Sequence, residues 1–304
     1  MHALILAAGR GSRFAESKPK CLVEVGGRPL VLHQLEAAKA AGARRVTLVT
    51  GHEHELVRAA VGDAAEIVRN ARYAETNSLY SFWLARLRVH GDVLVMNCDV
   101  LFPHDVLRGL LHRGSALAFD SRSGDSREHV KVSVEDGRLL EMSKELPSQE
   151  TDGENLGLLH LTEEVARAAF DTAAQLISRG HERAWLGSAI NAVARRHAIA
   201  CVDVAGLPWV EINEPRDLAE ARAQVWPAIA QLRSHQATLR ARLREQRVMV
   251  PSAFDLAMAS RTDRLLGDTL DRGGSRVSAI SSRAAGRVFP GGGAYESAPV
   301  SAVG

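Results

Sequence analysis

Apolar residues in the first 120 positions follow two alternating spacings. Short, nearly continuous apolar runs predict buried strands at 3–7, 46–50, 65–68, 92–96 and 115–119. Between these runs, apolar side chains recur at helical spacing and predict helices over 30–42, 53–61, 77–87 and 103–112. Strands that alternate with helices pair in parallel through right-handed crossovers. The pattern therefore predicts a doubly wound α/β fold with a mostly parallel sheet.

From residue 130 onward, shorter strands replace this regular alternation. The runs 130–134 and 138–142 are joined by Glu135-Asp136-Gly137, and an Asp-Gly pair between two strands is a strong hairpin signal. Further strands are predicted at 156–161, 199–204 and 209–212, and further helices at 162–178, at 184–197 and from Pro215. The second half is therefore predicted to add a hairpin-rich insert to the α/β layer.

The C-terminal part of the chain has a different composition. Ile229, Leu232, Leu239 and Leu243 keep helical spacing among many arginines and predict an amphipathic helix up to about residue 247. A further helix is predicted over 253–266, whereas the residues from 267 onward are rich in Gly, Ser, Arg and Ala and cannot build a core. We therefore predict a domain of residues 1–226, a helical extension of residues 227–266 and a flexible tail or linker of residues 267–304.

Composition narrows the class of protein only a little. The 304 residues are 46% hydrophobic with a net charge of +2, so bulk charge gives no reason to expect nucleic acid or a membrane as a partner. We expect no signal peptide before the first strand and no membrane span, because no apolar run reaches the roughly 18 residues that a span needs. Cys21, Cys98 and Cys201 fit no zinc spacing and are expected to be reduced core residues of a cytoplasmic protein.

The loop after the first strand carries the strongest chemical signal. Gly9 and Gly11 allow backbone N–H groups to turn toward one point, and Lys18 and Lys20 follow within reach. The loop matches neither G-x-x-x-x-G-K-[ST] nor G-x-G-x-x-G. It is suited to an anion such as a triphosphate, with an ordinary strand-to-helix turn as the alternative.

The same loop and the segment after it resemble a known superfamily. L-A-A-G-x-G-x-R, followed by Lys18-Pro19-Lys20 and the stretch 21–30, resembles nucleotidyltransferases that activate sugars, choline phosphate and isoprenoid precursors as nucleotide diphosphates. The resemblance extends over residues 3–222 and implies a Rossmann-like nucleotidyltransferase fold, with the insert covering the bound acceptor. It implies that the nucleotide contacts Leu6, Ala7, Ala8, Gly9 and Gly11.

Three basic residues of this segment are the candidate catalytic groups. The resemblance implies that Lys20 neutralises charge at the α-phosphate, because nucleotidyl transfer depends on positioning and electrostatic stabilisation. Arg10 and Arg13 are expected to hold the β- and γ-phosphates that leave as pyrophosphate. Solvated surface cations are the alternative interpretation.

Two later segments supply candidate ligands for Mg²⁺. Asp99 follows an apolar strand, and ligands of open α/β sheets bind outside the carboxyl ends of strands, where a carboxylate can hold Mg²⁺. The segment 209–218 resembles the late acidic motif of the superfamily and implies that Glu211 is the second ligand. Asn213 stands where the family usually has Asp, so its role as a ligand through the amide oxygen is left open. A turn aspartate is the alternative for Asp99.

A third segment narrows the subfamily. Asn70-x-x-Tyr73-x-x-Thr76-Asn77-Ser78-Leu79-Tyr80-Ser81 resembles choline-phosphate cytidylyltransferases of the bacterial type and their phosphonate-using relatives. The residues expected to contact the nucleotide's ribose or base are Asn70, Thr76, Asn77 and Ser78, although Asn77 or Ser78 would also cap the following helix. The residues expected to bind the acceptor are Lys131, Lys144 and Glu154, with solvated hairpin side chains as the alternative.

Together these features predict a Mg²⁺-dependent cytidylyltransferase. It would transfer CMP from CTP to a small phosphorylated or phosphonate acceptor and release pyrophosphate. A sugar-1-phosphate nucleotidyltransferase and a catalytically silent module that binds a nucleotide and recruits a partner are the alternatives. A homodimer is left open, and the faint resemblance of 287–292 to aminotransferases of the glutamate-semialdehyde type leaves open a fused or partner PLP enzyme. His52, His129, His160 and His181 lack metal spacing and receive no predicted role.

Overall fold

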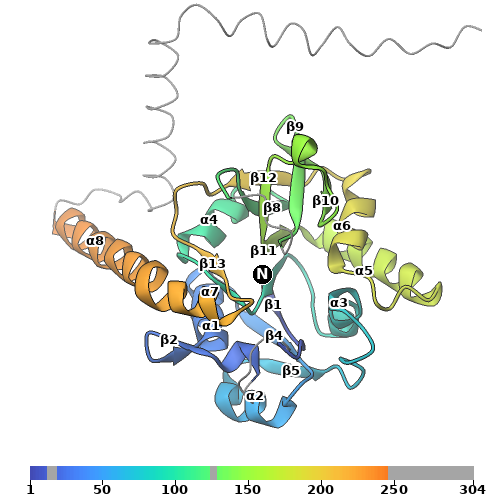
Figure 1. Cartoon of the computed structure of the whole chain (residues 1–304), viewed down its shortest axis with the longest axis horizontal. Helices are drawn as coiled ribbons and strands as arrows, with labels where there is room; N and C mark the ends of the chain where they lie inside the picture. The colour runs from blue at the N-terminus through green and yellow to red at the C-terminus, as the bar shows by residue number, and fades with distance from the viewer. Residues whose placement is uncertain (12–18, 124–128, 246–304) are drawn as a thin grey trace, which may run out of the picture. The chain divides into compact units, whose positions relative to one another are not determined.

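The computed structural model describes residues 1–11, 19–123 and 129–245, with side chains described up to residue 237. In this part of the chain, nine strands form one mixed sheet in the order β5-β4-β1-β6-β11-β8-β12-β10-β9 (Figure 1). The strands are β1 (His2–Ala7), β4 (Arg45–Thr50), β5 (Glu66–Arg69), β6 (Val93–Asn97), β8 (Ala116–Asp120), β9 (Lys131–Glu135), β10 (Arg138–Ser143), β11 (Gly153–Leu161) and β12 (Ala200–Asp203).

One side of the sheet has the predicted parallel pairing. β5, β4, β1 and β6 are parallel neighbours, with His2 opposite both Arg45 and Val93. Strand β11 then lies antiparallel between β6 and β8, so β8 keeps the direction of β6 without pairing with it. The hydrophobic pattern predicted β11 as a strand but did not indicate this central position.

The remaining strands build the insert and two small sheets. Asp136 (φ 50°) and Gly137 (φ 73°) both have positive φ between β9 and β10, which confirms the predicted Asp-Gly turn. Strand β9 also pairs with the start of β11. Separately, β13 (Val210–Glu211) pairs with β7 (Val100–Leu101), and β2 (Glu24–Val25) pairs with β3 (Arg28–Pro29).

Helices cover both faces of the sheet because the side chains of β1 alternate between two cores. Ala3, Ile5 and Ala7 belong to the core under α1, α2 and α4, whereas Leu4 and Leu6 belong to the core under α3, α5 and α6. These helices are α1 (Leu30–Ala40), α2 (His54–Val61), α3 (Ser78–Leu84), α4 (Asp105–Leu111), α5 (Glu163–Ser178) and α6 (Leu186–Ala194). The predicted doubly wound α/β fold is confirmed.

The helical segment after the insert begins at Pro215 as predicted. Helix α7 (Pro215–Glu220) has a capping box formed by Glu214 and Asp217, and a π-helical stretch leads on to α8 (Trp226–Glu245). Ile229 of α8 is buried in a third core against α1 and β2. The described helices include none long and apolar enough to cross a membrane. The helix predicted over 253–266 and the tail of 267–304 lie outside the described residues, and the domain division stays a prediction.

Candidate active site

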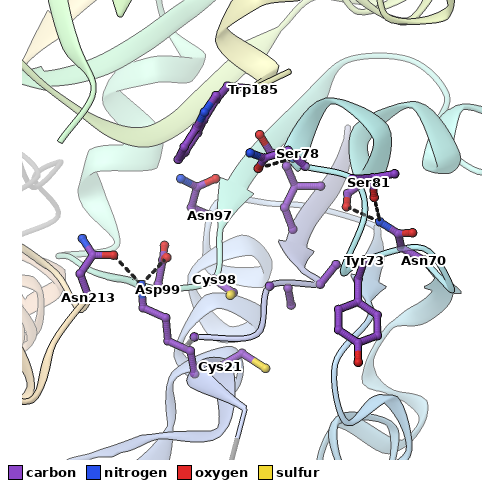
Figure 2. A pocket seen from close by; sticks show the side chains of 18 of the residues that line it. Cys21, Asn70, Tyr73, Ser78, Ser81, Asn97, Cys98, Asp99, Trp185 and Asn213 are labelled. Carbon is purple, nitrogen blue, oxygen red and sulfur yellow. Dashed lines mark hydrogen bonds and ion pairs between the residues drawn. The ribbon is translucent and has the colours of Figure 1, made fainter. Parts of the chain in front are cut away.

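A cavity of about 360 Å³ opens at the carboxyl ends of β1 and β6. This is the edge at which open α/β sheets bind their ligands. Figure 2 shows that the side chains around it come from segments far apart in the sequence. The lining residues are Leu6, Ala7, Ala8, Gly9, Gly11, Lys20, Cys21, Asn70, Tyr73, Thr76, Asn77, Ser78, Ser81, Asn97, Cys98, Asp99, Lys144, Trp185, Glu211 and Asn213.

Lys20 connects three of these segments. Its Nζ donates to Asp99 Oδ2 at 2.8 Å and to Asn213 Oδ1 at 2.7 Å (Figure 2). Burial acts to lower the pKa of Lys20, but the Asp99 carboxylate and then Glu211 outweigh this and raise the pKa. The side chain is therefore a fixed, charged ammonium at one end of the cavity.

The three predicted metal ligands lie together beside this ammonium. Strand β13 pairs Glu211 with Val100, next to Asp99, and alternation along the chain puts Asn213 on the face of Glu211. Burial first, and then the charge of Asp99, raise the pKa of Glu211. Two partly buried carboxylates on adjacent segments favour a cation between them.

The donor set fits a hard divalent cation. Asp99 Oδ1 is buried and has no hydrogen-bond partner among the described residues. Mg²⁺ lies about 2.0–2.1 Å from its oxygen ligands, which is closer than a hydrogen-bonded water molecule could lie to the same carboxylate oxygen. An oxygen that is buried from water can therefore still be a ligand of the ion. No group of three His, Cys, Asp or Glu in the described part of the chain could hold a metal by itself. Substrate phosphates would complete the coordination, as is usual for Mg²⁺.

The glycine loop reaches the cavity as predicted. Gly11 has a φ of +62°, and a Cβ at this position would lie 2.9 Å from the Cβ of Lys20, so glycine lets the loop approach the lysine. Gly9 also lines the cavity. Arg10 is exposed and does not line it, and Arg13 lies outside the described residues, so their phosphate-binding role stays a prediction.

Asn70, Thr76, Asn77 and Ser78 all line the cavity, and hydrogen bonds fix the loop that carries them. Asn70 is buried, and its Nδ2 donates to Thr76 Oγ1 and Ser81 Oγ, both at 3.1 Å. Asn77 Oδ1 accepts from the N–H of Ser78 at 2.8 Å, the capping contact expected at the start of α3. These residues therefore shape the loop as well as facing the cavity.

The predicted acceptor ligands are separated by the structure. Lys144 lines the cavity, and its Nζ lies 4.3 Å from the ring centroid of Trp185. Lys131 is buried on β9 and donates to the carbonyl of Leu146 at 3.1 Å. Glu154 is buried on β11. Neither Lys131 nor Glu154 lines this cavity or the one next to it, so only Lys144 is placed for direct contact.

A second cavity of about 230 Å³ adjoins the first on the insert side. The two cavities share Ser78, Asn97, Lys144, Trp185 and Glu211. The second adds, among others, Glu141, Met142, Glu145, Asn155 and Asn191. The hairpin and the start of α6 therefore form a compartment beside the charged end of the first cavity.

Sequence analysis did not assign Trp185, which lines both cavities and is labelled at the first of them in Figure 2. Its side chain is 49% exposed, unusually high for an aromatic residue of this size. A tryptophan in the first turn of the helix predicted at 184–197 was the available signal; the observed helix α6 begins one residue after it. Because half of its surface is uncovered beside a cavity, the ring is available to a ligand.

His129 is a second residue without a predicted role that lies close to the site. Its Nδ1 is 2.7 Å from Glu154 Oε2 and its Nε2 is 3.8 Å from Glu211 Oε2. The hydrogen bond with Glu154 raises the pKa of His129, and the charge of Glu211 adds to this, although burial acts in the opposite direction. Spacing gave no signal, because both partners are distant in the sequence.

Cys21 and Cys98 are free and buried, as predicted, but the structure also places both against the cavity (Figure 2). They flank the catalytic candidates, one following Lys20 and the other preceding Asp99. A hydrogen bond with Cys21, together with burial, raises the pKa of the Cys98 thiol well above its usual value. Cys98 is therefore protonated at neutral pH.

A glycine-lined cavity at the strand ends of an α/β sheet, with a fixed ammonium beside two carboxylates, is suited to an anionic ligand. The family model of the MobA-like NTP transferase domain matches residues 3–250, so the chain belongs to this nucleotidyltransferase family. The chain is 30% identical over 238 residues to the bifunctional IPC transferase and DIPP synthase of Rubrobacter xylanophilus, covering 74% of this chain and 52% of that protein.

A further relative and a solved structure are also similar to this chain. The CMP-5'-(3-aminopropyl)phosphonate synthase of Streptomyces rubellomurinus is 30% identical over 253 residues, covering 77% of this chain and 40% of that protein. The inositol-1-phosphate CTP transferase of T. maritima shares the fold, with a TM-score of 0.63 at 22% identity over 75% of this chain and 94% of that one. The chain spans about half the length of the curated relatives that it matches first.

Proposed function

We propose that this protein transfers CMP from CTP to a small phosphorylated or phosphonate acceptor and releases pyrophosphate. The observation that carries the proposal is the Lys20 ammonium, held between Asp99 and Asn213 at the end of a glycine-lined cavity. A relative that is 30% identical is named as the synthase of a CMP-linked phosphonate, which supports both CTP and this class of acceptor.

In the proposed reaction, an acceptor oxygen attacks the α-phosphorus of CTP. The new P–O bond forms in line as the bond to the pyrophosphate oxygen breaks. Lys20 places its charge where the α-phosphate gains negative charge, and the backbone of Gly9 and Gly11 faces the triphosphate. Asp99, Glu211 and the amide oxygen of Asn213 would hold Mg²⁺, which supplies charge neutralisation for the substrate phosphates.

The second cavity is the proposed acceptor compartment. Among the described residues, three carboxylates line it, from Glu141, Glu145 and Glu211, together with the ammonium of Lys144. The anionic end of an acceptor would lie toward Lys20 and Lys144, and the carboxylates favour a cationic group at the other end. This distribution supports aminoalkyl phosphonates and phosphocholine-like compounds as acceptors.

The test is a matrix of nucleotides and acceptors read out as pyrophosphate release. Purified full-length protein with Mg²⁺ is incubated with CTP, UTP, GTP or ATP and with choline phosphate, 2-aminoethylphosphonate or a sugar 1-phosphate. We expect release with CTP and a phosphonate or phosphorylated amine, and its loss on chelation with EDTA. The absence of pyrophosphate from CTP with every acceptor would refute the proposal.

One outcome of this matrix and one separate experiment would support the alternatives. Turnover confined to sugar 1-phosphates would make the protein a sugar nucleotidyltransferase. An Asp99→Ala variant that keeps full cellular function would favour a silent nucleotide-binding module that recruits a partner.

A further inference from the structure

A histidine and a buried glutamate lie directly behind one of the proposed metal ligands. His129 faces a carboxylate with each ring nitrogen, at 2.7 Å for Glu154 Oε2 and 3.8 Å for Glu211 Oε2. The side chain of Glu154 is only 3% exposed, whereas those of His129 and Glu211 are 22% and 19% exposed. Glu154 is therefore the buried end of the row Glu154, His129, Glu211, and Glu211, which lines the cavity, is the other end.

Glu154, the inner residue of the three, is held in the sheet. Glu154 lies on β11, opposite Asp120 of β8 and Lys131 of β9, so two neighbouring strands hold its backbone. Trp209 packs near the histidine, with ring centroids 6.1 Å apart, and its Nε1 donates to Asp120 Oδ2 at 2.7 Å. The imidazole is thus fixed by a rigid carboxylate and flanked by an aromatic ring.

The outer end is less firmly fixed. Glu211 is in a strand of only two residues, and two polar groups face its carboxylate: the imidazole of His129 and the amide of Asn213. A carboxylate that binds a metal needs its orientation fixed by partners behind it, and such partners are worth about 10–100-fold in metal affinity. Neither His129 nor Glu154 lines either cavity, so any effect on the reaction must pass through Glu211.

We propose that Glu154 and His129 are positioning residues that hold the Glu211 carboxylate in the orientation required by the divalent cation. Glu154 fixes the imidazole, and the imidazole fixes the carboxylate. The proposal rests on the metal site of the proposed function. It also gives Glu154 a role other than the direct contact with the acceptor that the sequence predicted.

The test measures metal binding without turnover. Mn²⁺ alone is titrated into full-length protein, and free Mn²⁺ is measured by electron paramagnetic resonance for the wild type, His129→Gln and Glu154→Gln. We expect Kd for Mn²⁺ to rise about 10–100-fold in each variant. His112→Gln is the matched control, because this histidine is exposed at the end of α4 and should leave Kd unchanged. Asp99→Asn should weaken binding at the ligand itself.

Two further measurements separate positioning from general damage to the fold. In steady-state assays, His129→Gln should raise the Mg²⁺ concentration for half-maximal activity while kcat recovers at saturating Mg²⁺. Because Glu154 acts only through His129, the two losses should not add. The double variant should have a Kd for Mn²⁺ no higher than that of the single variant with the higher Kd. Glu154→Gln keeps the shape of the side chain and supplies the test if His129→Gln does not fold.

Several outcomes would overturn the proposal. These are an unchanged Kd for Mn²⁺ in both variants, additive losses in the double variant, or a fall in kcat that saturating Mg²⁺ does not restore. Wild-type protein that binds no Mn²⁺ would also overturn it. If Mn²⁺ binding weakens as expected while no nucleotide and acceptor release pyrophosphate, the positioning role stands and the proposed reaction alone fails.

Discussion

The two sides of the candidate active site are built differently. On the proposed nucleotide side, buried groups that hydrogen-bond to one another hold the backbone, as Asn70 does for the loop before α3. On the acceptor side, the compartment is lined by the exposed carboxylates of Glu141 and Glu145 and by the half-exposed ring of Trp185. A rigid, closely packed side suits a ligand that never changes, whereas exposed side chains can be replaced without disturbing the fold. The difference predicts which substitutions alter catalysis, stability or acceptor choice.

The largest effect is expected from Lys20→Met. The substitution removes the ammonium that lies at the α-phosphate in the proposed reaction, and the loss of one such preorganised group typically lowers kcat by about 10²–10³-fold. The measurement is pyrophosphate release at saturating substrates. Lys39→Met, at an exposed lysine of α1, is the matched control and should retain wild-type kcat. A kcat for Lys20→Met within threefold of the wild type would contradict the catalytic role.

Gly51→Ala should damage the nucleotide side by destabilising the fold. A Cβ at this position would lie 2.5 Å from the Cβ of Tyr73 and 2.6 Å from the carbonyl oxygen of Ala8. Such overpacking costs about 1–3 kcal/mol in the free energy of unfolding, measured by urea denaturation. Gly9→Ala is the contrasting variant, because a Cβ there meets no atom of the described residues within 4 Å. It should leave stability intact and raise KM for CTP; equal stability of the two variants would contradict this account.

Trp185→Leu should affect the acceptor more than the nucleotide. The Lys144 ammonium lies over the ring, 4.3 Å from its centroid, so the ring already contacts one cation. A similar cation–π contact with the cationic group of an acceptor would be worth about 0.5–2 kcal/mol. We therefore expect KM for a cationic acceptor to rise up to about thirtyfold, with a smaller change in KM for CTP. Leu87→Ala, at a residue that is 71% exposed, is the control. A larger rise in KM for CTP than for the acceptor would place Trp185 on the nucleotide side.

The contact between α8 and the start of α4, made by Arg233 and His104, should weaken in acid. Burial first, and then the Arg233 guanidinium, lower the pKa of His104 to about 4, while Glu36 and Asp105 act to raise it and His33 to lower it. Arg233 Nη2 donates to His104 Nε2 at 2.5 Å, which requires a neutral ring. Because the folded state binds a proton at His104 less readily than the unfolded state does, protonation favours unfolding. The contribution of His104 to the free energy of unfolding is fully present above about pH 6.5 and is lost toward pH 4, by at most about 1.4 kcal/mol per pH unit. Urea denaturation across this range should show the slope in the wild type and a reduced slope in His104→Gln.

The smallest effect is expected where the two sides are tied together at the surface. Arg72 Nη1 and Nη2 each donate to the Glu182 carboxylate at 2.9 Å, joining the nucleotide loop to the segment before Trp185. The pair is exposed and screened by salt, so Arg72→Gln should lower Tm only slightly, and less so at high ionic strength. Arg58→Gln, at an exposed pair within α2, is the control. A large loss of acceptor affinity in Arg72→Gln would show that the Arg72–Glu182 pair determines the shape of the acceptor compartment.

Much of the fold could be predicted because its signals are local. The alternation of strands and helices, the Asp136-Gly137 turn and the start of α7 at Pro215 each depend on a few neighbouring residues. The position of β11 could not be predicted in this way, because its pairing with both β6 and β8 depends on contacts between distant segments. Hydrophobic periodicity marks a strand but not its neighbours.

In the candidate site too, residues that lie in local motifs could be predicted, whereas residues placed by tertiary packing could not. Lys20, Asp99, Glu211 and Asn213 lie in motifs that resemble a family, and the structure brings them together. Trp185 belongs to no such motif. The roles of Lys131 and Glu154 depend on burial, which a hairpin sequence does not reveal, so both looked like surface groups that face a ligand. Residues that choose the acceptor are harder to find, because their positions are set by tertiary packing.

The central place of β11 also bears on how the chain folds during synthesis. The parallel strands β5, β4, β1 and β6 are complete once residue 97 has left the ribosome, but β6 then presents an unpaired edge. Strand β11, at Gly153–Leu161, is the strand that covers this edge and connects it to β8. Until it emerges, the nascent chain carries an exposed apolar edge of the kind that promotes aggregation. Translation of the intervening residues is therefore the interval in which a chaperone would matter most.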